Sequence, residues 1–313
     1  MVRLQREVKQ MGTVITISVT HPHADIILNE VEARLQEYEQ RFSANDASSE
    51  LMKVNQAAGQ KAVSVHPDLY ALIKLGLQHS LAHGSHLNIA IGPLVQLWRI
   101  GFSDAQLPST NQIQTALQLI DPSQIELNDQ DTSVFLKRAG MKLDLGALAK
   151  GYSADLIIEF FRDIGVTQGM INLGGNLLTL GPPPTKRPDG KWRVGIQDPT
   201  KPRGENRVIV KSYDQSVVTS GIYERQLTVD GKTYHHIFDS ETGYPVATDV
   251  ASITIISDRS VDGEIWTTRL FGKSLEEILT QVEQLEAIET IIITEDRDVY
   301  ASPGIQNDII VLA

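Results

Sequence analysis

The chain contains no cysteine. This absence excludes disulfide bonds, thiolate metal sites, a cysteine nucleophile and a lipid-modified N-terminal cysteine. The sequence also has no uninterrupted apolar run of membrane-spanning length, so we expect no membrane segment in this chain. Residues 1–7 lack the apolar core of a signal peptide. We therefore expect a cytoplasmic protein, with a removed leader as the open alternative.

The chain has fewer basic than acidic residues. The 28 lysine and arginine residues are outnumbered by 39 aspartate and glutamate residues, which gives a formal net charge of −11. This balance argues against general nucleic-acid binding, and a phosphate ligand would need local positive charge or a metal. Hydrophobic residues make up 41% of the 313 residues and charged residues 21%, as in ordinary globular proteins. Because no linker-like stretch divides the chain, we expect one domain over residues 1–313.

Apolar periodicity predicts a mixture of helices and strands. Strands and helices do not alternate in a regular βαβ order, which favours a single α+β domain with a largely antiparallel sheet and packed helices. The main predicted strands cover residues 14–20, 134–143, 169–176, 217–221, 234–238, 252–257 and 290–294, and the main predicted helices cover residues 24–42, 67–83, 107–121, 146–161, 260–272 and 275–285.

The stretch 143–155 combines a carboxylate, small residues, a lysine and the start of a helix. Free backbone N–H groups at a helix start favour a phosphate, and a lysine in the first turns adds a point charge. Asp144 and Lys150 are therefore candidate ligand contacts. The alternative is that Asp144 only caps the helix and Lys150 is only a solvated side chain.

Two patterns could hold a metal ion. Glu264 and Thr268 are four residues apart on a predicted helix, so both oxygens share one face and suit a hard cation such as Mg²⁺; the alternative is a helix-surface pair. His79 and His83 have the same spacing and precede His86, which could be a zinc site. No glutamate follows His79, however, so the metalloprotease motif is absent.

Several short motifs follow one another in a specific order. Taken together they resemble the ApbE family, the FAD:protein FMN transferases. The motifs are Met11-Gly12-Thr13, Phe42-Ser43 with Ser49-Glu50-Leu51 and Asn55, Gly92-Pro93-Leu94-Val95 with Leu97-Trp98, Asp144-Leu145-Gly146-Ala147 with Ala149-Lys150-Gly151, Asn172-Leu173-Gly174-Gly175, Thr219-Ser220-Gly221, His236-Ile237 with Asp239 and Thr242-Gly243, and Thr268 with Leu270-Phe271.

The resemblance implies a T-fold-like domain that binds FAD as a substrate and Mg²⁺ as a metal. It further implies transfer of FMN from FAD to a threonine hydroxyl of an acceptor flavoprotein, through a phosphoester bond and with AMP leaving. Two alternatives remain open from the sequence. One is an FAD pyrophosphatase, in which water replaces the threonine, and the other is a flavin-binding protein without catalysis.

The resemblance also assigns roles to individual residues, and it gives none to His79 and His83. His236 matches the histidine of the family's His-Ile-x-Asp motif, near the flavin end. Because a threonine hydroxyl is a weak nucleophile that needs a base, we take His236 as the candidate general base, with Asp239 as an alternative. The implied FAD contacts are Met11, Asn88, Ile89, Ala90, Asp144, Lys150, His236 and Ile237, and the implied Mg²⁺ ligands are the main-chain oxygen of Ala147 and the side chains of Glu264 and Thr268.

The sequence departs from the family pattern at three places. Asn88 and Glu264 both stand where the family commonly has aspartate, and residues 239–243 read Asp-Ser-Glu-Thr-Gly instead of Asp-Pro-x-Thr-Gly. Asp262 lies close to Glu264 but stands six residues before Thr268 rather than four. We therefore expect Glu264 to be the metal carboxylate, with Asp262 as the alternative.

Overall fold

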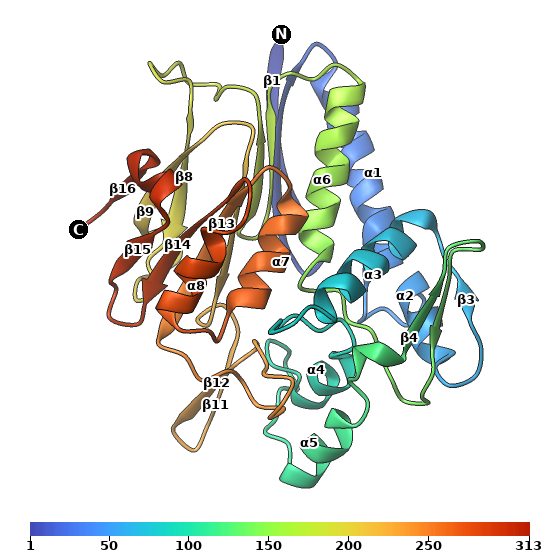
Figure 1. The fold of residues 1–313 in the computed structure, drawn as a ribbon. Helices are drawn as coiled ribbons and strands as arrows, with labels where there is room; N and C mark the ends of the chain where they lie inside the picture. Colours follow the sequence, from blue (N-terminus) through green and yellow to red (C-terminus); the bar gives the residue numbers. More distant parts are fainter.

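The computed structural model describes residues 1–313, and its centre is one eight-stranded antiparallel sheet (Figure 1). The strand order is β1-β2-β6-β7-β10-β13-β14-β15, so the chain adds strands from one edge of the sheet to the other. The strands are β1 (Val2–Gln10), β2 (Thr13–His21), β6 (Gly169–Leu173), β7 (Asn176–Leu180), β10 (Ser216–Gly221), β13 (Val250–Ser257), β14 (Ile288–Thr294) and β15 (Val299–Ala301). The predicted class, α+β with a largely antiparallel sheet, is confirmed.

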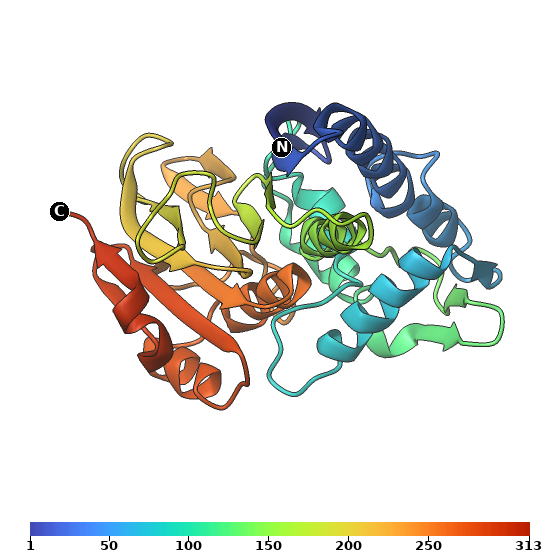
Figure 2. The ribbon, with the colours of Figure 1, turned by 90° about the horizontal axis from the view of Figure 1, so that it is seen from above.

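Helices and two smaller sheets surround the main sheet. Figures 1 and 2 show α1 and α6 running beside its N-terminal strands, and α7 and α8 beside its C-terminal strands. The helices are α1 (Ala24–Phe42), α2 (Glu50–Gln56), α3 (Pro67–Ser80), α4 (Gly92–Trp98), α5 (Thr110–Leu117), α6 (Ala149–Asp163), α7 (Ser260–Leu270) and α8 (Leu275–Val282), with short 3₁₀ turns η1 (Pro122–Gln124) and η2 (Pro303–Asp308). No helix combines the length and the apolar character needed to span a membrane.

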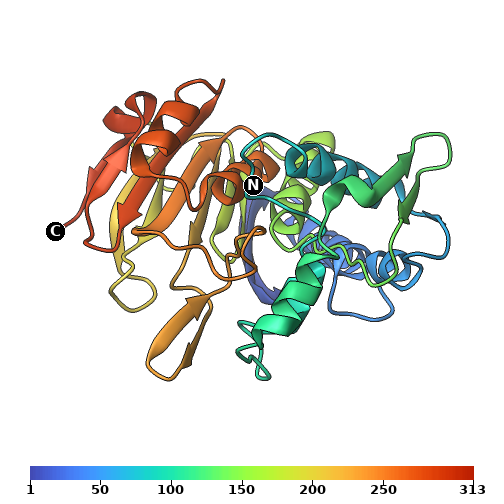
Figure 3. The same cartoon turned by 60° about the horizontal axis from the view of Figure 1, so that its bottom comes forward.

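The remaining strands form small sheets at the periphery. β3 (Val63–Ser64), β5 (Ser133–Leu136) and β4 (Ile125–Asn128) form one, and β16 (Ile309–Val311), β9 (Asn206–Ser212) and β8 (Trp192–Gln197) form another. β11 (Gln226–Val229) and β12 (Lys232–His235) form a hairpin, which projects from the same end of the molecule as α5 (Figure 3).

Strand β13 lies where both faces of the sheet are covered, and every one of its eight residues is buried. Its residues alternate between two hydrophobic clusters, as the period of a strand requires. Ile253 and Ile255 pack with Leu270 and Phe271 from the α7 side. Ile256 packs with Val208 of the small β16-β9-β8 sheet on the opposite face. The β-branched run in the sequence is therefore a central strand between two layers.

Several predicted boundaries were wrong; among them, α7 ends at Leu270 rather than residue 272 and α8 at Val282 rather than residue 285. The predicted strand 134–143 ends as β5 at Leu136, since the next stretch turns at Gly140 and the Asn55 side chain pairs with Leu143, accepting from its N–H and donating to its carbonyl. Helix α3 ends at Ser80 rather than residue 83, α5 is shorter than 107–121, and α6 begins at Ala149 because residues 146–148 form turns.

Helices α6 and α7 approach each other closely at Gly151. A Cβ atom at this position would lie 2.6 Å from the Ser260 carbonyl oxygen and 2.7 Å from Glu264 Cγ. We expect Gly151→Ala to lower the free energy of unfolding by about 1–3 kcal/mol, because the helices must move apart. In an exposed helix the same change would stabilise by about 1 kcal/mol. Chemical denaturation measures the sign.

The matched control is Glu159→Ala, an exposed position on the same helix. This variant should stay within about 0.5 kcal/mol of the unaltered protein. If Gly151→Ala were at least as stable as Glu159→Ala, the close contact between α6 and α7 would not constrain residue 151.

Candidate functional site

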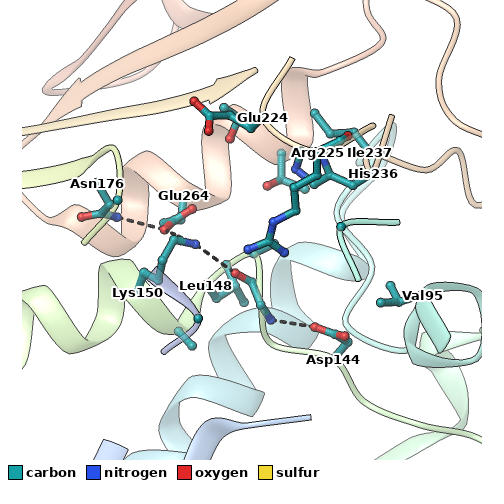
Figure 4. A pocket seen from close by; sticks show the side chains of 18 of the residues that line it. Val95, Asp144, Leu148, Lys150, Asn176, Glu224, Arg225, His236, Ile237 and Glu264 are labelled. Atoms are coloured by element: carbon teal, nitrogen blue, oxygen red, sulfur yellow. Dashed lines mark hydrogen bonds and ion pairs between the residues drawn. The ribbon is translucent and has the colours of Figure 1, made fainter. Parts of the chain in front are cut away.

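A cavity of ≈ 670 Å³ lies where the start of α6, one face of α7, the end of β10 and the segment before α4 meet. Cavities of this volume are typical of small-molecule sites. Figure 4 shows side chains from these separate parts of the chain facing one space. The lining includes all but one of the residues that the sequence singled out for FAD or Mg²⁺: Met11, Asn88, Ile89, Asp144, Ala147, Lys150, His236, Ile237, Glu264 and Thr268.

Asp144 forms the turn that leads into α6. Its Oδ1 accepts a hydrogen bond of 2.8 Å from the Gly146 N–H, and its own N–H donates to the Ile89 carbonyl at 2.9 Å. Burial raises the pKa of the Asp144 carboxyl above its usual range, although the Gly146 N–H and the charge of Arg225 oppose the shift. Asp144 therefore closes a turn before the helix and does not cap it, because the N-cap of α6 is Leu148 and receives no side-chain hydrogen bond. Asp144 also lines the cavity.

Lys150 is not simply a solvated surface side chain, which was the alternative interpretation of its role from the sequence. Its side chain is 27% exposed, and its Nζ lies 3.3 Å from Glu264 Oε1. The same Nζ donates a hydrogen bond of 3.2 Å to the Gly146 carbonyl oxygen. Lys150 thus links the turn before α6 to α7 and carries its charge into the cavity, as Figure 4 shows.

Glu264 is the buried carboxylate of the site, with only 5% of its surface exposed. Its Oε1 accepts from Lys150 and from Asn176 Nδ2 at 3.0 Å. Asn176 is in turn held by Ser260, whose Oγ donates to Asn176 Oδ1 at 2.5 Å. A buried charge requires such partners, and these fix the direction of the carboxylate.

Three oxygens next to these contacts are left without a hydrogen-bond partner. They are Glu264 Oε2, Thr268 Oγ1 and the main-chain oxygen of Ala147, and all three residues line the cavity. Thr268 follows Glu264 by one turn of α7, so both side chains lie on one face. A carboxylate, a hydroxyl and a carbonyl are hard ligands of the kind that Mg²⁺ takes while keeping other positions for water and phosphate. The residues present therefore fit this metal.

Asp262, the alternative metal carboxylate, points elsewhere. It does not line the cavity, and its Oδ1 lies 4.0 Å from Arg259 Nη1. The half-turn of helix between Asp262 and Glu264 places them on different faces of α7. The geometry thus favours Glu264 over Asp262 as the carboxylate that faces the ligand.

His236 and His235 follow one another at the end of the β11–β12 hairpin and face in different directions. His236 lines the cavity, whereas His235 Nε2 donates to the Val246 carbonyl at 2.9 Å. His236 Nδ1 lies 3.4 Å from the Arg225 carbonyl oxygen, which can only accept, so Nδ1 carries the proton and Nε2 is free to accept one. Burial, followed by the charge of Arg225, lowers the pKa of His236 to about 4.

The remaining candidates come from two turns. Met11 has φ 51° and Gly12 has φ 70°, the left-handed pair that closes a two-residue hairpin between β1 and β2. Asn88 donates to the Ile120 carbonyl at 2.8 Å and accepts from the Ala90 N–H at 2.8 Å. Ala90 itself is fully buried and does not line the cavity. Ile237, next to His236 in the chain, packs against the buried hydrophobic cluster that includes Leu270 and Phe271.

The zinc interpretation of the histidines is wrong. Arg269 Nη1 donates to His79 Nδ1 at 3.0 Å, so that nitrogen is occupied by a cationic side chain. His83 lies beyond the end of α3 and does not share its face. No group of three or more His, Asp or Glu side chains is arranged to hold a metal ion.

Sequence reasoning missed Arg225 as a site residue. It lies in the loop between β10 and β11, lines the cavity, and influences the pKa of both His236 and Asp144. A lone arginine in a loop has no periodicity to mark it. The only available signal was its position four residues after Thr219-Ser220-Gly221, a stretch that also lines the cavity.

The fold and the cavity define an α+β protein with a ligand site at the start of one helix and along the face of another. Comparison with known sequences gives the family. The sequence model of the ApbE family matches residues 11–292, and the chain therefore belongs to the ApbE family.

Named relatives and solved structures agree with this assignment. A protein of Klebsiella pneumoniae named FAD:protein FMN transferase is 39% identical over 93% of this chain and 89% of its own length. One of the same name from Treponema pallidum is 36% identical over 96% of this chain and 87% of its own. The ApbE protein of Thermotoga maritima has the same fold, with TM-score 0.89 at 24% identity over 98% of this chain and 99% of its own. The flavin transferase ApbE of Vibrio cholerae reaches TM-score 0.83 at 22% identity, over 98% and 99%.

Proposed function

We propose that this ApbE-family enzyme transfers FMN from FAD to a threonine hydroxyl of an acceptor flavoprotein, with release of AMP and with a requirement for Mg²⁺. The observation that carries the proposal is the set of three unpartnered oxygens of Ala147, Glu264 and Thr268 beside Lys150 in one cavity. The names of the relatives at 39% and 36% identity support the flavin donor and the transfer reaction.

The reaction needs charge neutralisation around the pyrophosphate of FAD. When bound by Glu264, Thr268 and the Ala147 carbonyl, Mg²⁺ would supply positive charge to the phosphate oxygens. Lys150 Nζ lies 3.3 Å from Glu264 and is therefore placed to contact the same phosphates. In the turn between Asp144 and α6, Gly146 and Leu148 already use their N–H groups, but the Ala147 N–H has no partner and adds a donor for an anion at the helix start.

The acceptor hydroxyl is a weak nucleophile and needs a base. His236 Nε2 is free to accept the hydroxyl proton, since Nδ1 donates to the Arg225 carbonyl. The threonine oxygen forms a bond to the phosphorus attached to the flavin side. The bond from that phosphorus to the bridging oxygen breaks, and AMP leaves with the electron pair. Negative charge from the bound pyrophosphate raises the basicity of His236 at the moment it is needed.

The acceptor must reach the cavity from outside. Several lining residues are exposed, among them Asn45, Arg203 and Glu224. They come from the loop after α1 and from the loops around β9 and β10, so the cavity opens between separate surface loops. A threonine on a loop or strand of a partner protein can enter such an opening without unfolding either protein.

One incubation separates the proposed function from its two rivals. FAD and Mg²⁺ are mixed with the enzyme, with and without an acceptor flavoprotein, and the products are separated under denaturing conditions. The proposal expects flavin bound covalently to the acceptor together with an equal amount of AMP. Free FMN and AMP that form equally with or without the acceptor would identify a pyrophosphatase. Intact FAD in every tube would identify a flavin-binding protein without catalysis.

A further inference from the structure

We propose that Arg225 binds the phosphate of the FMN half of FAD and stabilises that phosphoryl group while it is transferred. This inference rests on the proposed function, because it names a further residue for the same reaction. Neither the sequence motifs nor the predicted roles of the site residues included Arg225.

The cations that line the cavity differ in whether they are already paired. Only three lysine or arginine side chains do so: Lys150, Arg203 and Arg225. Lys150 is paired with Glu264 at 3.3 Å and also donates to the Gly146 carbonyl. Arg203 Nη2 lies 3.5 Å from Glu224 Oε2. The guanidinium of Arg225 makes no hydrogen bond and no ion pair with another residue, and Figure 4 accordingly draws none to the lining residues that it shows. Its five N–H donors are therefore available to a ligand.

The surrounding backbone directs the Arg225 side chain toward the cavity. Gly101 lies directly beneath its side chain, where a Cβ atom at residue 101 would lie 2.6 Å from Arg225 Cδ. The Arg225 carbonyl oxygen is 3.4 Å from His236 Nδ1, so the arginine and the proposed base are tied together through the main chain. Figure 4 shows the Arg225 side chain extending away from His236 into the middle of the cavity.

The position of His236 indicates which phosphate of FAD Arg225 contacts. The base must lie beside the attacking hydroxyl, and the hydroxyl attacks the phosphorus that stays with the flavin. Arg225 enters the cavity from the same side as His236 and carries its guanidinium from there toward the middle of the cavity (Figure 4), where we place it against the phosphoryl group that the hydroxyl attacks. Lys150, Glu264 and Thr268 belong to the start of α6 and to α7 on the other side of the cavity. A planar guanidinium matches two phosphate oxygens at once, which a lysine cannot do.

The charges fit the reaction. In transfer, the threonine O–P bond forms as the bond to the bridging oxygen breaks, the hydroxyl proton passes to His236 Nε2, and AMP carries away the electron pair. Charge is spread over the non-bridging oxygens of the transferred phosphoryl group, where an arginine is most effective. The same charge also helps to keep His236 unprotonated before FAD arrives, because it lowers the pKa of that imidazole.

The test compares ligands that differ by one phosphate. Equilibrium titrations measure the affinities of riboflavin, FMN and AMP for the unaltered enzyme and for Arg225→Ala, without any acceptor. Loss of a charged hydrogen-bonded contact should lower the affinity for FMN by about tenfold to a hundredfold. The affinities for riboflavin and AMP should change by less than twofold. The control Arg187→Ala removes an exposed arginine that does not line the cavity, and it should leave all three affinities unchanged.

Rescue provides the second measurement. Guanidinium ion at millimolar concentration should restore part of the AMP release that Arg225→Ala loses, and Arg225→Lys should recover less than the added guanidinium does. An unchanged ratio of FMN to riboflavin affinity in Arg225→Ala would overturn the proposal, and so would a loss confined to AMP. Because these affinities need no transfer, they stay informative if the unaltered enzyme proves not to transfer FMN.

Discussion

Replacing Glu264 by glutamine should lower Mg²⁺-dependent FMN transfer on the order of 100-fold or more, and it should raise the Mg²⁺ concentration needed for half-maximal rate. Glutamine keeps the shape of the side chain and its contact with Asn176, so the fold around α7 is retained. The change removes the negative charge that faces Thr268 and the Ala147 carbonyl. The rate of AMP release over a range of Mg²⁺ concentrations measures the effect, and calorimetric titration with Mg²⁺ measures binding independently of turnover.

The matched control is Asp262→Asn, on the same helix but outside the cavity. It removes the same charge two residues away and should change the rate by no more than a few-fold. Glu264→Asp then measures how much the Mg²⁺-dependent rate changes when the carboxylate side chain is one methylene shorter. Full activity of Glu264→Gln at limiting Mg²⁺, combined with a loss in Asp262→Asn, would make Asp262 the metal carboxylate and refute the assignment.

Replacing His236 by glutamine should lower the rate of transfer by about 10²–10⁴-fold, the usual contribution of a general base. The affinity for FAD should fall much less than the rate does, because the imidazole acts as a base on the acceptor hydroxyl in addition to contacting FAD. The acid limb of kcat/KM against pH should lie near pH 4, since burial and Arg225 lower the pKa of His236 to about 4. The sign follows from the role: as pH falls through that value the imidazole gains a proton and can no longer accept one.

His235→Gln is the control for this prediction. His235 Nε2 donates to the Val246 carbonyl and its Nδ1 accepts from the Ile237 N–H, so its role is to hold the turn after β12. Its replacement should lower stability more than it lowers turnover in the folded enzyme. If His236→Gln transferred FMN as fast as His235→Gln, His236 would not be the base. The alternative base, Asp239, does not line the cavity, and its two carboxylate oxygens accept hydrogen bonds from the Glu241 N–H and the Thr242 hydroxyl.

Much of the architecture was readable from the chain itself. The β-branched run at residues 252–257 predicted a strand, and its two-sided burial as β13 follows from the same apolar residues. The four-residue spacing of Glu264 and Thr268 by itself predicted that both side-chain oxygens lie on one helical face. Local patterns of this kind can be read from the sequence because they depend only on the residue repeat of a helix or a strand. The hairpin β11–β12 also has a local signal in Asp230-Gly231, whose φ angles of 50° and 76° suit a two-residue turn.

What the sequence by itself determined was therefore the set of elements, the ApbE family and the residue types of the site. Only the tertiary structure decided which charges are paired. Lys150 and Glu264 are 114 positions apart, and neither residue's neighbours reveal that they meet at 3.3 Å. The free state of Arg225 likewise depends on Gly101 and His236, which come from other parts of the chain. Pairing between distant side chains depends on how layers pack, and no local period of the sequence encodes it.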